Sequence, residues 1–134
     1  MTEDQKTAAR AEIAELMQRY AHATDFADRE TYALLFTEDG VLDLPGGVEF
    51  KGREALRNTP KPETLRRRHY FTTPALSFTS DTDAEGAGYC LLLTYDVPSK
   101  DLQPTYSVDY QTSYRKTPDG WRITRQRVRP SFGG

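Results

Sequence analysis

The sequence predicts an α+β protein in which N-terminal helices pack on a curved, mostly antiparallel sheet. Three observations support this fold class: the chain begins with an amphipathic helical pattern, strand-like segments alternate with turns through the second half, and no strong helical pattern follows residue 62. A chain of 134 residues can close one hydrophobic core. We therefore expect a single domain over residues 1–134, with helices over about residues 5–58 and mainly strands over about residues 66–129.

Two helices are expected at the N-terminus. Over residues 5–25, apolar side chains recur every three or four positions and so share one helix face. A shorter helix is predicted to start at Asp28, a residue type that caps helix N-termini, and to bury Tyr32 and Phe36. The turn-forming stretch Thr37-Glu38-Asp39-Gly40 is expected to end this second helix.

A hairpin, a short helix and four longer strand regions are expected next. Residues 45–47, Pro-Gly-Gly, join the strand-like segments 41–44 and 48–50, and residues 52–57 are predicted to form one or two helical turns. The longer strand regions are predicted over residues 68–78 with a bend at Pro74, and over 88–97, 105–116 and 121–129.

The strand over residues 88–97 is largely apolar on both faces. Tyr, Leu and Val side chains alternate with Cys, Leu and Thr side chains along it. Helices that cover only one side of the sheet would leave the other apolar face in water. We therefore expect a second subunit on the outer face, which gives a homodimer or a homotrimer assembled through the sheet.

The composition limits which partners the protein is expected to bind and in which cellular compartment it is expected to lie. The formal net charge is −2 and the mean hydropathy is −0.74, so charge gives no reason to expect nucleic acid or an acidic membrane as a partner. No apolar run approaches the roughly 20 residues of a membrane helix, and residues 1–10 lack an apolar signal core. The single cysteine, Cys90, excludes an internal disulfide and a cysteine-built zinc site. We expect a cytoplasmic protein.

His69 is the main candidate for acid–base chemistry, and Asp25 is the candidate carboxylate that orients it. A carboxylate that accepts a hydrogen bond from one imidazole nitrogen leaves the other nitrogen free to exchange protons near neutral pH. Structural interpretations remain open for both: His69 as a strand histidine bonded to a backbone carbonyl, and Asp25 as a helix-end residue. We expect the preceding arginines, residues 66–68, to form a solvated rim rather than to steer an anionic substrate.

The candidate substrate-binding residues are mostly aromatic. They are Tyr20, Phe36, Phe71, Tyr95, Asp96, Tyr106 and Tyr110. A desolvated tyrosine hydroxyl can stabilise a developing enolate oxygen, although strands favour tyrosine and packing is the common role. Asp96 is either a second acid–base group or a turn residue at a strand end. The sequence has no glycine-rich phosphate loop, no G-x-S-x-G elbow and no His-x-x-x-His pair, so we expect catalysis without a cofactor or a metal.

Several stretches together resemble the SnoaL-like group of the nuclear transport factor two-like superfamily, whose members are cone-shaped α+β barrels. The matching stretches are Tyr20 to Asp25, Phe36 to Val41, Phe50 to Leu56, Arg68 to Phe71 and Tyr114 to Ile123. Within this group the chemical pattern is most similar to scytalone dehydratase. That resemblance matches Asp25 and His69 to an aspartate–histidine pair, with Asp28 at an acidic neighbour.

The surroundings of this pair differ from the family pattern. Thr24 stands where the family has a tyrosine, Asp96 where it has a second histidine, and Tyr110 where it has an asparagine. Tyr20, one helical turn before Thr24, is expected to take the place of the missing tyrosine. These differences imply a different substrate.

Two functions follow from the resemblance. The first is a cofactor-independent lyase, isomerase or cyclase, such as a dehydratase or a polyketide cyclase, acting on a small hydrophobic oxygenated molecule of polyketide or terpenoid type. In it His69 transfers protons and Asp25 orients His69. The second is a non-catalytic subunit for ligand binding or assembly, similar to the small subunits of ring-hydroxylating dioxygenases.

Overall fold

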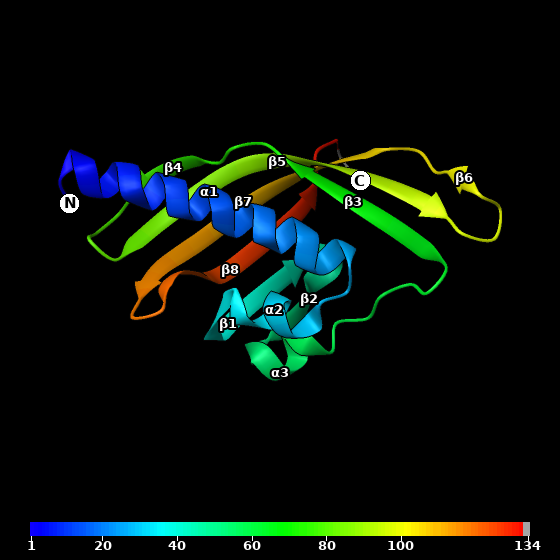
Figure 1. Cartoon of the computed structure of the whole chain (residues 1–134), viewed down its shortest axis with the longest axis horizontal. Helices are drawn as coiled ribbons and strands as arrows, with labels where there is room; N and C mark the ends of the chain where they lie inside the picture. The colour runs from blue at the N-terminus through cyan, green and yellow to red at the C-terminus, as the bar shows by residue number, and fades with distance from the viewer. Residues whose placement is uncertain (133–134) are drawn as a thin grey trace.

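The computed structural model describes residues 1–132, in which three α-helices pack against a sheet of eight strands, two of them before the first strand and one after the second (Figure 1). The elements in chain order are α1 (Glu3–Asp25), α2 (Arg29–Leu34), β1 (Phe36–Leu44), a 3₁₀ turn (Pro45–Gly47), β2 (Val48–Lys51), α3 (Gly52–Arg57), β3 (Leu65–Phe71), β4 (Ala75–Phe78), β5 (Asp83–Asp96), β6 (Asp101–Leu102), β7 (Tyr106–Thr117) and β8 (Gly120–Pro130).

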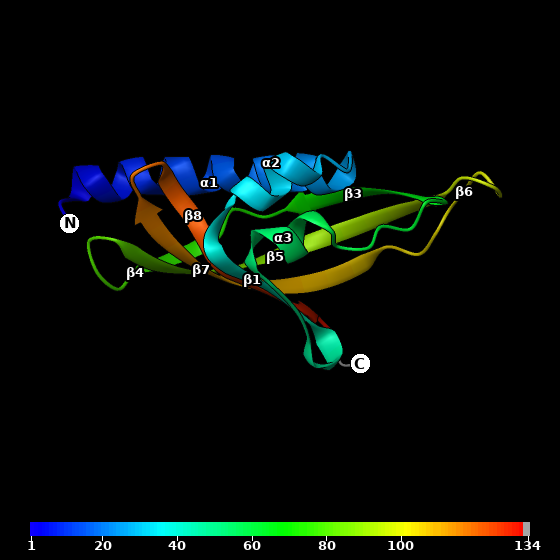
Figure 2. The same cartoon turned by 90° about the horizontal axis from the view of Figure 1, so that it is seen from below.

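The sheet has the order β2-β1-β8-β7-β5-β3, and both β4 and β6 pair with β5. Every pair is antiparallel except β1 with β8, which run parallel. The sheet curves, and α1 and α2 lie together on its concave side (Figure 2). β3 is an edge strand, and the end of the sheet that carries β3, β5 and β6 extends beyond the helices (Figures 1 and 2). The predicted fold class is confirmed.

α1 is fixed at its start by a capping box. The Thr2 hydroxyl accepts from the Gln5 backbone N–H at 3.1 Å, and the Gln5 side chain accepts from the Thr2 N–H at 2.8 Å. One stripe of the helix is buried against the sheet: Ala9, Ile13, Leu16, Met17, Tyr20, Ala21 and Ala23. α1 stops where Ala27 adopts a left-handed backbone conformation (φ 54°), which leaves Asp25 on the last turn. No helix within residues 1–132 has the length and apolarity needed to cross a membrane.

The stretch 37–40 is strand, not the predicted turn. β1 begins at Phe36, which pairs with Ile123 of β8, and the register shifts before Val41. Gly40 allows this irregularity, because a Cβ at that position would lie 2.7 Å from the Cβ of Phe36. Residues 37–40 therefore form the irregular stretch of β1 between two positions that pair with β8, and the pairing on either side keeps them within the strand.

Other boundaries also differ from the sequence prediction. β5 begins at Asp83 rather than at residue 88, although its first residues, Asp-Ala-Glu-Gly-Ala, are poor strand formers. Pairing with β4 on one side and β7 on the other holds them extended. β3 begins earlier than predicted, at Leu65, and β6 lies in a segment for which no strand was predicted. The predicted interruption near Pro74 is present between β3 and β4.

Candidate active site

Asp25 and His69 meet at the edge of the sheet. The Asp25 Oδ1 atom lies 2.6 Å from His69 Nδ1, and Asp25 Oδ2 accepts the backbone N–H of His69 at 3.1 Å. Because β3 is an edge strand, this N–H has no neighbouring strand to bond, and the carboxylate at the end of α1 takes that place. The Asp25 side chain is only 3% exposed and the His69 side chain only 8%.

This geometry orients the imidazole. A carboxylate next to Nδ1 favours a proton on that nitrogen and leaves the lone pair on Nε2, for which no hydrogen-bond partner is present among residues 1–132. The ring also stacks on Phe71, two residues along the same face of β3, with 6.1 Å between centroids and 14° between planes. His69 is thus held by Asp25 on one side and by Phe71 on the other.

An aromatic cluster lies next to the pair. The Phe71 ring packs edge-on against Tyr110 at 4.8 Å and against Tyr20 at 5.7 Å between centroids. Tyr20 in turn packs against Phe36 at 6.2 Å and against Tyr32 at 5.2 Å. The structure therefore brings four of the seven candidate substrate-binding residues together beside His69, and they come from α1, β1, β3 and β7.

The tyrosine hydroxyls of this cluster are buried and neutral. Burial raises the pKa of Tyr20 to about 12, and it raises the pKa values of Tyr32 and Tyr110 well above the ordinary tyrosine value. The Tyr20 and Tyr32 hydroxyls lie 3.3 Å apart and share a hydrogen bond. These phenols therefore act as hydrogen-bond donors at any physiological pH.

The remaining candidates lie elsewhere. Tyr95 is paired with Arg66 and, since side chains alternate along a strand, lies on the sheet face opposite to His69. Asp96 accepts the Ser99 backbone N–H at 3.0 Å, and hydrogen bonds from Ser99 lower the pKa of its carboxyl. Tyr106 is 59% exposed and, with Asp96, borders a second pocket of about 540 Å³ near the open end of the sheet. The structure does not bring these three residues to the Asp25–His69 pair.

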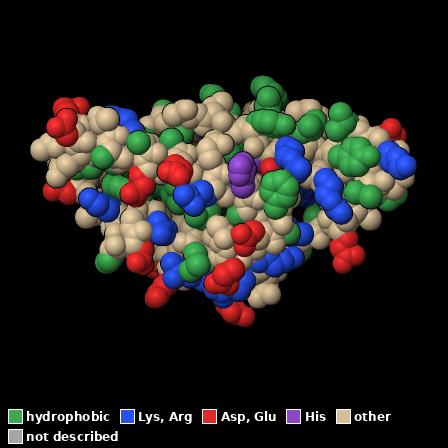
Figure 3. All heavy atoms as spheres, viewed as in Figure 1, with side chains coloured by type: hydrophobic (Ala, Val, Ile, Leu, Met, Phe, Trp, Pro, Cys, Tyr) green, Lys and Arg blue, Asp and Glu red, His purple; other side chains and the backbone are tan. Residues whose placement is uncertain are grey.

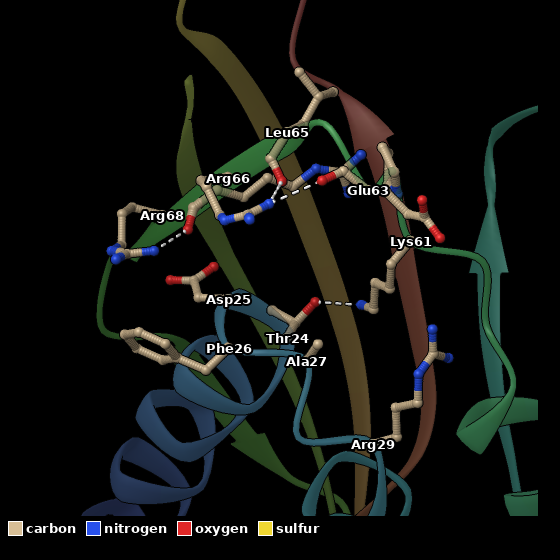
Figure 4. Close-up of a pocket in the computed structure, with 12 residues that line it drawn as sticks. Thr24, Asp25, Phe26, Ala27, Arg29, Lys61, Glu63, Leu65, Arg66 and Arg68 are labelled. Atoms are coloured by element: carbon tan, nitrogen blue, oxygen red, sulfur yellow. Dashed lines mark hydrogen bonds between the residues drawn. The ribbon is translucent and has the colours of Figure 1, made fainter. Parts of the chain in front are cut away.

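A pocket of about 710 Å³ opens between the end of α1, the α3–β3 connection and β3 (Figure 4). Asp25 contributes to its wall. Its lining residues are Thr24, Asp25, Phe26, Ala27, Arg29, Lys61, Pro62, Glu63, Leu65, Arg66, Arg67 and Arg68. In the space-filling view, basic side chains lie over β3 near the end of α1 (Figure 3).

Two lining residues, Lys61 and Arg67, were not singled out as site residues by the sequence prediction. The Lys61 ammonium donates to the Thr24 hydroxyl at 2.7 Å (Figure 4). It also lies 5.2 Å from the centroid of the Tyr32 ring. Its neighbours in sequence are prolines, which indicated only a chain break. The position of Arg67 could have been predicted from the sequence, because Arg67 lies two residues before His69 on the strand and so shares its face.

Comparison with known proteins places the chain among related folds. A model of the SnoaL-like domain matches residues 5–127. An NTF2-like protein with a cystatin-like fold from Novosphingobium aromaticivorans is 23% identical, with a TM-score of 0.84, and the match covers 97% of this chain and 86% of that one. No curated protein sequence matches the chain.

Two further neighbours carry enzyme names. A protein from Novosphingobium aromaticivorans, provisionally named scytalone dehydratase, is 20% identical with a TM-score of 0.86, over 98% of this chain and 89% of that one. The LinA-type3 hexachlorocyclohexane dehydrochlorinase from Novosphingobium barchaimii is 21% identical with a TM-score of 0.84, over 98% and 92% of the two chains. Such likenesses establish the cone-shaped NTF2-like fold.

Proposed function

Because the chain belongs to the SnoaL-like domain family, we propose that it is a cofactor-independent lyase, isomerase or cyclase in which His69 transfers protons and Asp25 orients it. The observation that carries this proposal is the buried contact between Asp25 Oδ1 and His69 Nδ1 at 2.6 Å. A histidine held in one tautomer by a buried carboxylate, with its second nitrogen unpaired, is a competent general base.

The proposed reaction begins with proton removal from a carbon next to a carbonyl group. His69 Nε2 takes the proton, the C–H electron pair passes into an enolate, and the Asp25 carboxylate stabilises the imidazolium that forms. The buried tyrosines beside Phe71 donate to the enolate oxygen. In an isomerisation the imidazolium then gives the proton to a different carbon of the conjugated enolate. In a dehydration the enolate electron pair forms a C=C bond, the C–O bond breaks, and the imidazolium protonates the departing hydroxyl, which leaves as water.

A small, hydrophobic, oxygenated substrate of polyketide or terpenoid type fits this setting. The ring cluster of Tyr20, Phe36, Phe71 and Tyr110 offers an apolar surface with phenol donors beside the imidazole. Two structural neighbours are named as a dehydratase and a dehydrochlorinase, names that describe eliminations, and they support the lyase class for this fold.

Hydrogen exchange on a simple ketone tests the proton transfer. We expect the protein to accelerate exchange of the α-hydrogens of 2-tetralone in D₂O, followed by proton NMR. His69→Gln and Asp25→Asn should each lower the enzymatic rate by about a hundredfold or more, because the base is lost or its tautomer is no longer fixed. His22→Gln, which changes the other histidine at an exposed position on α1, is the matched control. Unchanged exchange in His69→Gln would contradict the proposal.

Assembly is the second proposal, since the chain also offers an apolar outer face. We propose a homodimer or a homotrimer through the convex side of the sheet. Tyr70, Tyr89 and Leu91 on β3 and β5 are 58%, 62% and 53% exposed, which is unusual for neighbouring large apolar side chains. Tyr70 and Leu91 are direct cross-strand partners, so the exposed surface is continuous.

A further inference from the structure

The pocket beside Asp25 has an excess of positive charge. Five basic side chains line it, Arg29, Lys61, Arg66, Arg67 and Arg68, against the two carboxylates of Asp25 and Glu63. Both oxygens of Asp25 are already bonded to His69, and Glu63 is exposed at the rim. A dissolved anion would therefore meet a positive potential at the entrance to the pocket.

Three of these cations are bonded to backbone carbonyls. Arg29 donates to the carbonyls of Arg57 and Thr59, at 3.1 and 2.8 Å. Arg66 donates to the carbonyls of Glu63 and Leu65, while Arg68 donates to the Arg67 carbonyl and lies 4.7 Å from the Phe26 ring centroid. These contacts hold the three guanidinium groups at the rim.

Lys61 and Arg67 differ from these three. Both are half-buried, and neither has a carboxylate partner among residues 1–132. The Lys61 ammonium has only the Thr24 hydroxyl and the Tyr32 ring, and the Arg67 guanidinium makes no hydrogen bond within this part of the chain. Elsewhere several partly buried arginines do pair with carboxylates, such as Arg57 with Glu30 and Arg125 with Asp43.

Arg67 lies between the pocket beside Asp25 and the inner face of the sheet, and Lys61 lies in the same pocket. Arg67 shares the inner face of β3 with His69, and it lines both the pocket beside Asp25 and the second pocket, where Leu92, Thr94 and Tyr106 also lie. Lys61 lies on the α3–β3 connection and lines the pocket beside Asp25 together with Arg67. Burial, together with the positive charges of Arg67 and Arg29, lowers the pKa of Lys61 to about 8, so these cations lie close enough to repel one another.

We propose that the substrate carries a carboxylate, which Lys61 and Arg67 bind at the mouth of the pocket while Asp25 and His69 act on a neighbouring carbon. This inference rests on the proposed function and names its substrate class. The planar guanidinium can pair with both carboxylate oxygens, and the ammonium supplies a second charge-assisted donor. A bound anion also removes the repulsion between the two cations. Since the rings packed beside His69 are those of Phe71, Tyr20 and Tyr110, the rest of the substrate is apolar.

Binding of 2-naphthoate, compared with its methyl ester, tests the carboxylate site without requiring turnover. At pH 7 we expect the acid to bind at least about tenfold more tightly than the neutral ester, measured by calorimetry. Lys61→Met and Arg67→Met should each weaken binding of the acid by about tenfold and leave that of the ester unchanged. Lys61→Gln repeats the test with a polar side chain, and circular dichroism checks that each variant is folded.

Matched controls remove the same charges elsewhere. Lys116→Met and Arg19→Met change exposed side chains on β7 and α1, and they should leave the preference for the acid intact. Equal affinity for acid and ester in the wild-type protein, including no measurable binding of either, would overturn the inference. An equal loss in the control variants would overturn it as well, because the preference would then reflect net charge alone.

The His69→Gln variant separates this inference from the proposed function. If the carboxylate site exists, His69→Gln retains the preference for the acid although it no longer catalyses exchange. If the wild-type protein prefers the acid but does not exchange α-hydrogens, the carboxylate site is supported and the proposed reaction is ruled out. If it exchanges α-hydrogens without preferring the acid, the proposed reaction is supported and the carboxylate site is ruled out.

Discussion

At the scale of single residues, the contact between Asp25 and His69 depends on where two elements end. Asp25 is the last residue of α1, and a left-handed residue soon after it turns the chain toward α2. One carboxylate then serves both the backbone and the ring of a single residue on β3. No local pattern links these two positions, so from the sequence the pair rests on residue chemistry and, more strongly, on the family resemblance.

Other residues could not be placed from the sequence. Tyr95 and Tyr110 are both strand tyrosines, yet one faces outward and the other is buried beside Phe71, because side-chain direction depends on the register of each strand. Lys61 lies in a connection without regular structure, and its contacts are with Thr24 and Tyr32, both distant in the sequence. Arg67 was assigned to a solvated rim together with its neighbours, but it alone of the three is half-buried.

The buried amine of Lys61 predicts a pH-dependent effect on stability. Its pKa is about 8 in the folded protein and 10.5 without the fold, so the unfolded chain binds more protons between these pH values. The free energy of unfolding of the wild type should therefore rise, relative to Lys61→Met, as the pH increases from 8 to 10. Arg67, Arg29 and Asp25 are the charged groups that act on this amine, and they are retained in both proteins.

Urea unfolding at pH 7, 8, 9 and 10 measures this difference. Below pH 8 both states carry the proton, and the ammonium then opposes folding because it is partly desolvated. Lys116→Met, at an exposed position, should show a smaller change over the same range. A stability difference between the wild type and Lys61→Met that stays constant from pH 7 to 10 would show that the amine is well solvated.

At the scale of elements, a small residue on β5 leaves room for large side chains of the neighbouring strands. Gly86 on β5 is buried under Tyr114 and Leu76, and a Cβ at this position would lie 2.8 Å from Tyr114 Cε2 and 3.1 Å from Leu76 Cδ2. Tyr114 is 1% exposed and cannot move into solvent. The packing over β5 therefore requires glycine at position 86, although glycine is a residue type that is common in turns.

Gly86→Ala should destabilise the protein by about 1–3 kcal/mol through overpacking, measured by urea unfolding. Gly88→Ala is the matched control on the same face of the same strand, because its nearest new contact would be the Thr72 Oγ1 atom at an ordinary 3.4 Å. The control should change stability by less than about 0.5 kcal/mol, as is usual where no clash or cavity is created. Equal effects at the two positions would mean that the packing against Tyr114 is not the cause.

The first helix and the first hairpin could be predicted from the sequence, but the start of β1 could not. α1 was expected at residue 5 and begins at Glu3, and the β1–β2 hairpin lies where its Pro-Gly-Gly turn indicated. Residues 37–40 were mistaken for a turn because Thr, Glu, Asp and Gly prefer turns locally. They lie within β1 because the positions on either side, Phe36 and Val41, pair with β8, which lies far away in the sequence.

At the scale of the whole molecule, the sheet has one face under helices and one face in solvent. Assembly through the second face predicts that Leu91→Glu will lower the oligomeric state, because a carboxylate in an apolar interface must be desolvated. Light scattering after size-exclusion chromatography measures the mass. Leu34→Glu, an equivalent change at an exposed leucine of α2, should leave the mass unchanged. A monomeric wild-type protein would rule out the assembly.

The carboxylate of Asp25 also has a consequence for solubility. An edge strand with unpaired backbone N–H groups is a template on which a strand from another molecule can add, and growth of this kind leads to fibres. By occupying the N–H of His69, Asp25 blocks one position of that template near the middle of β3. The residue proposed to orient the base thus also covers a backbone hydrogen-bond donor at the edge of the sheet.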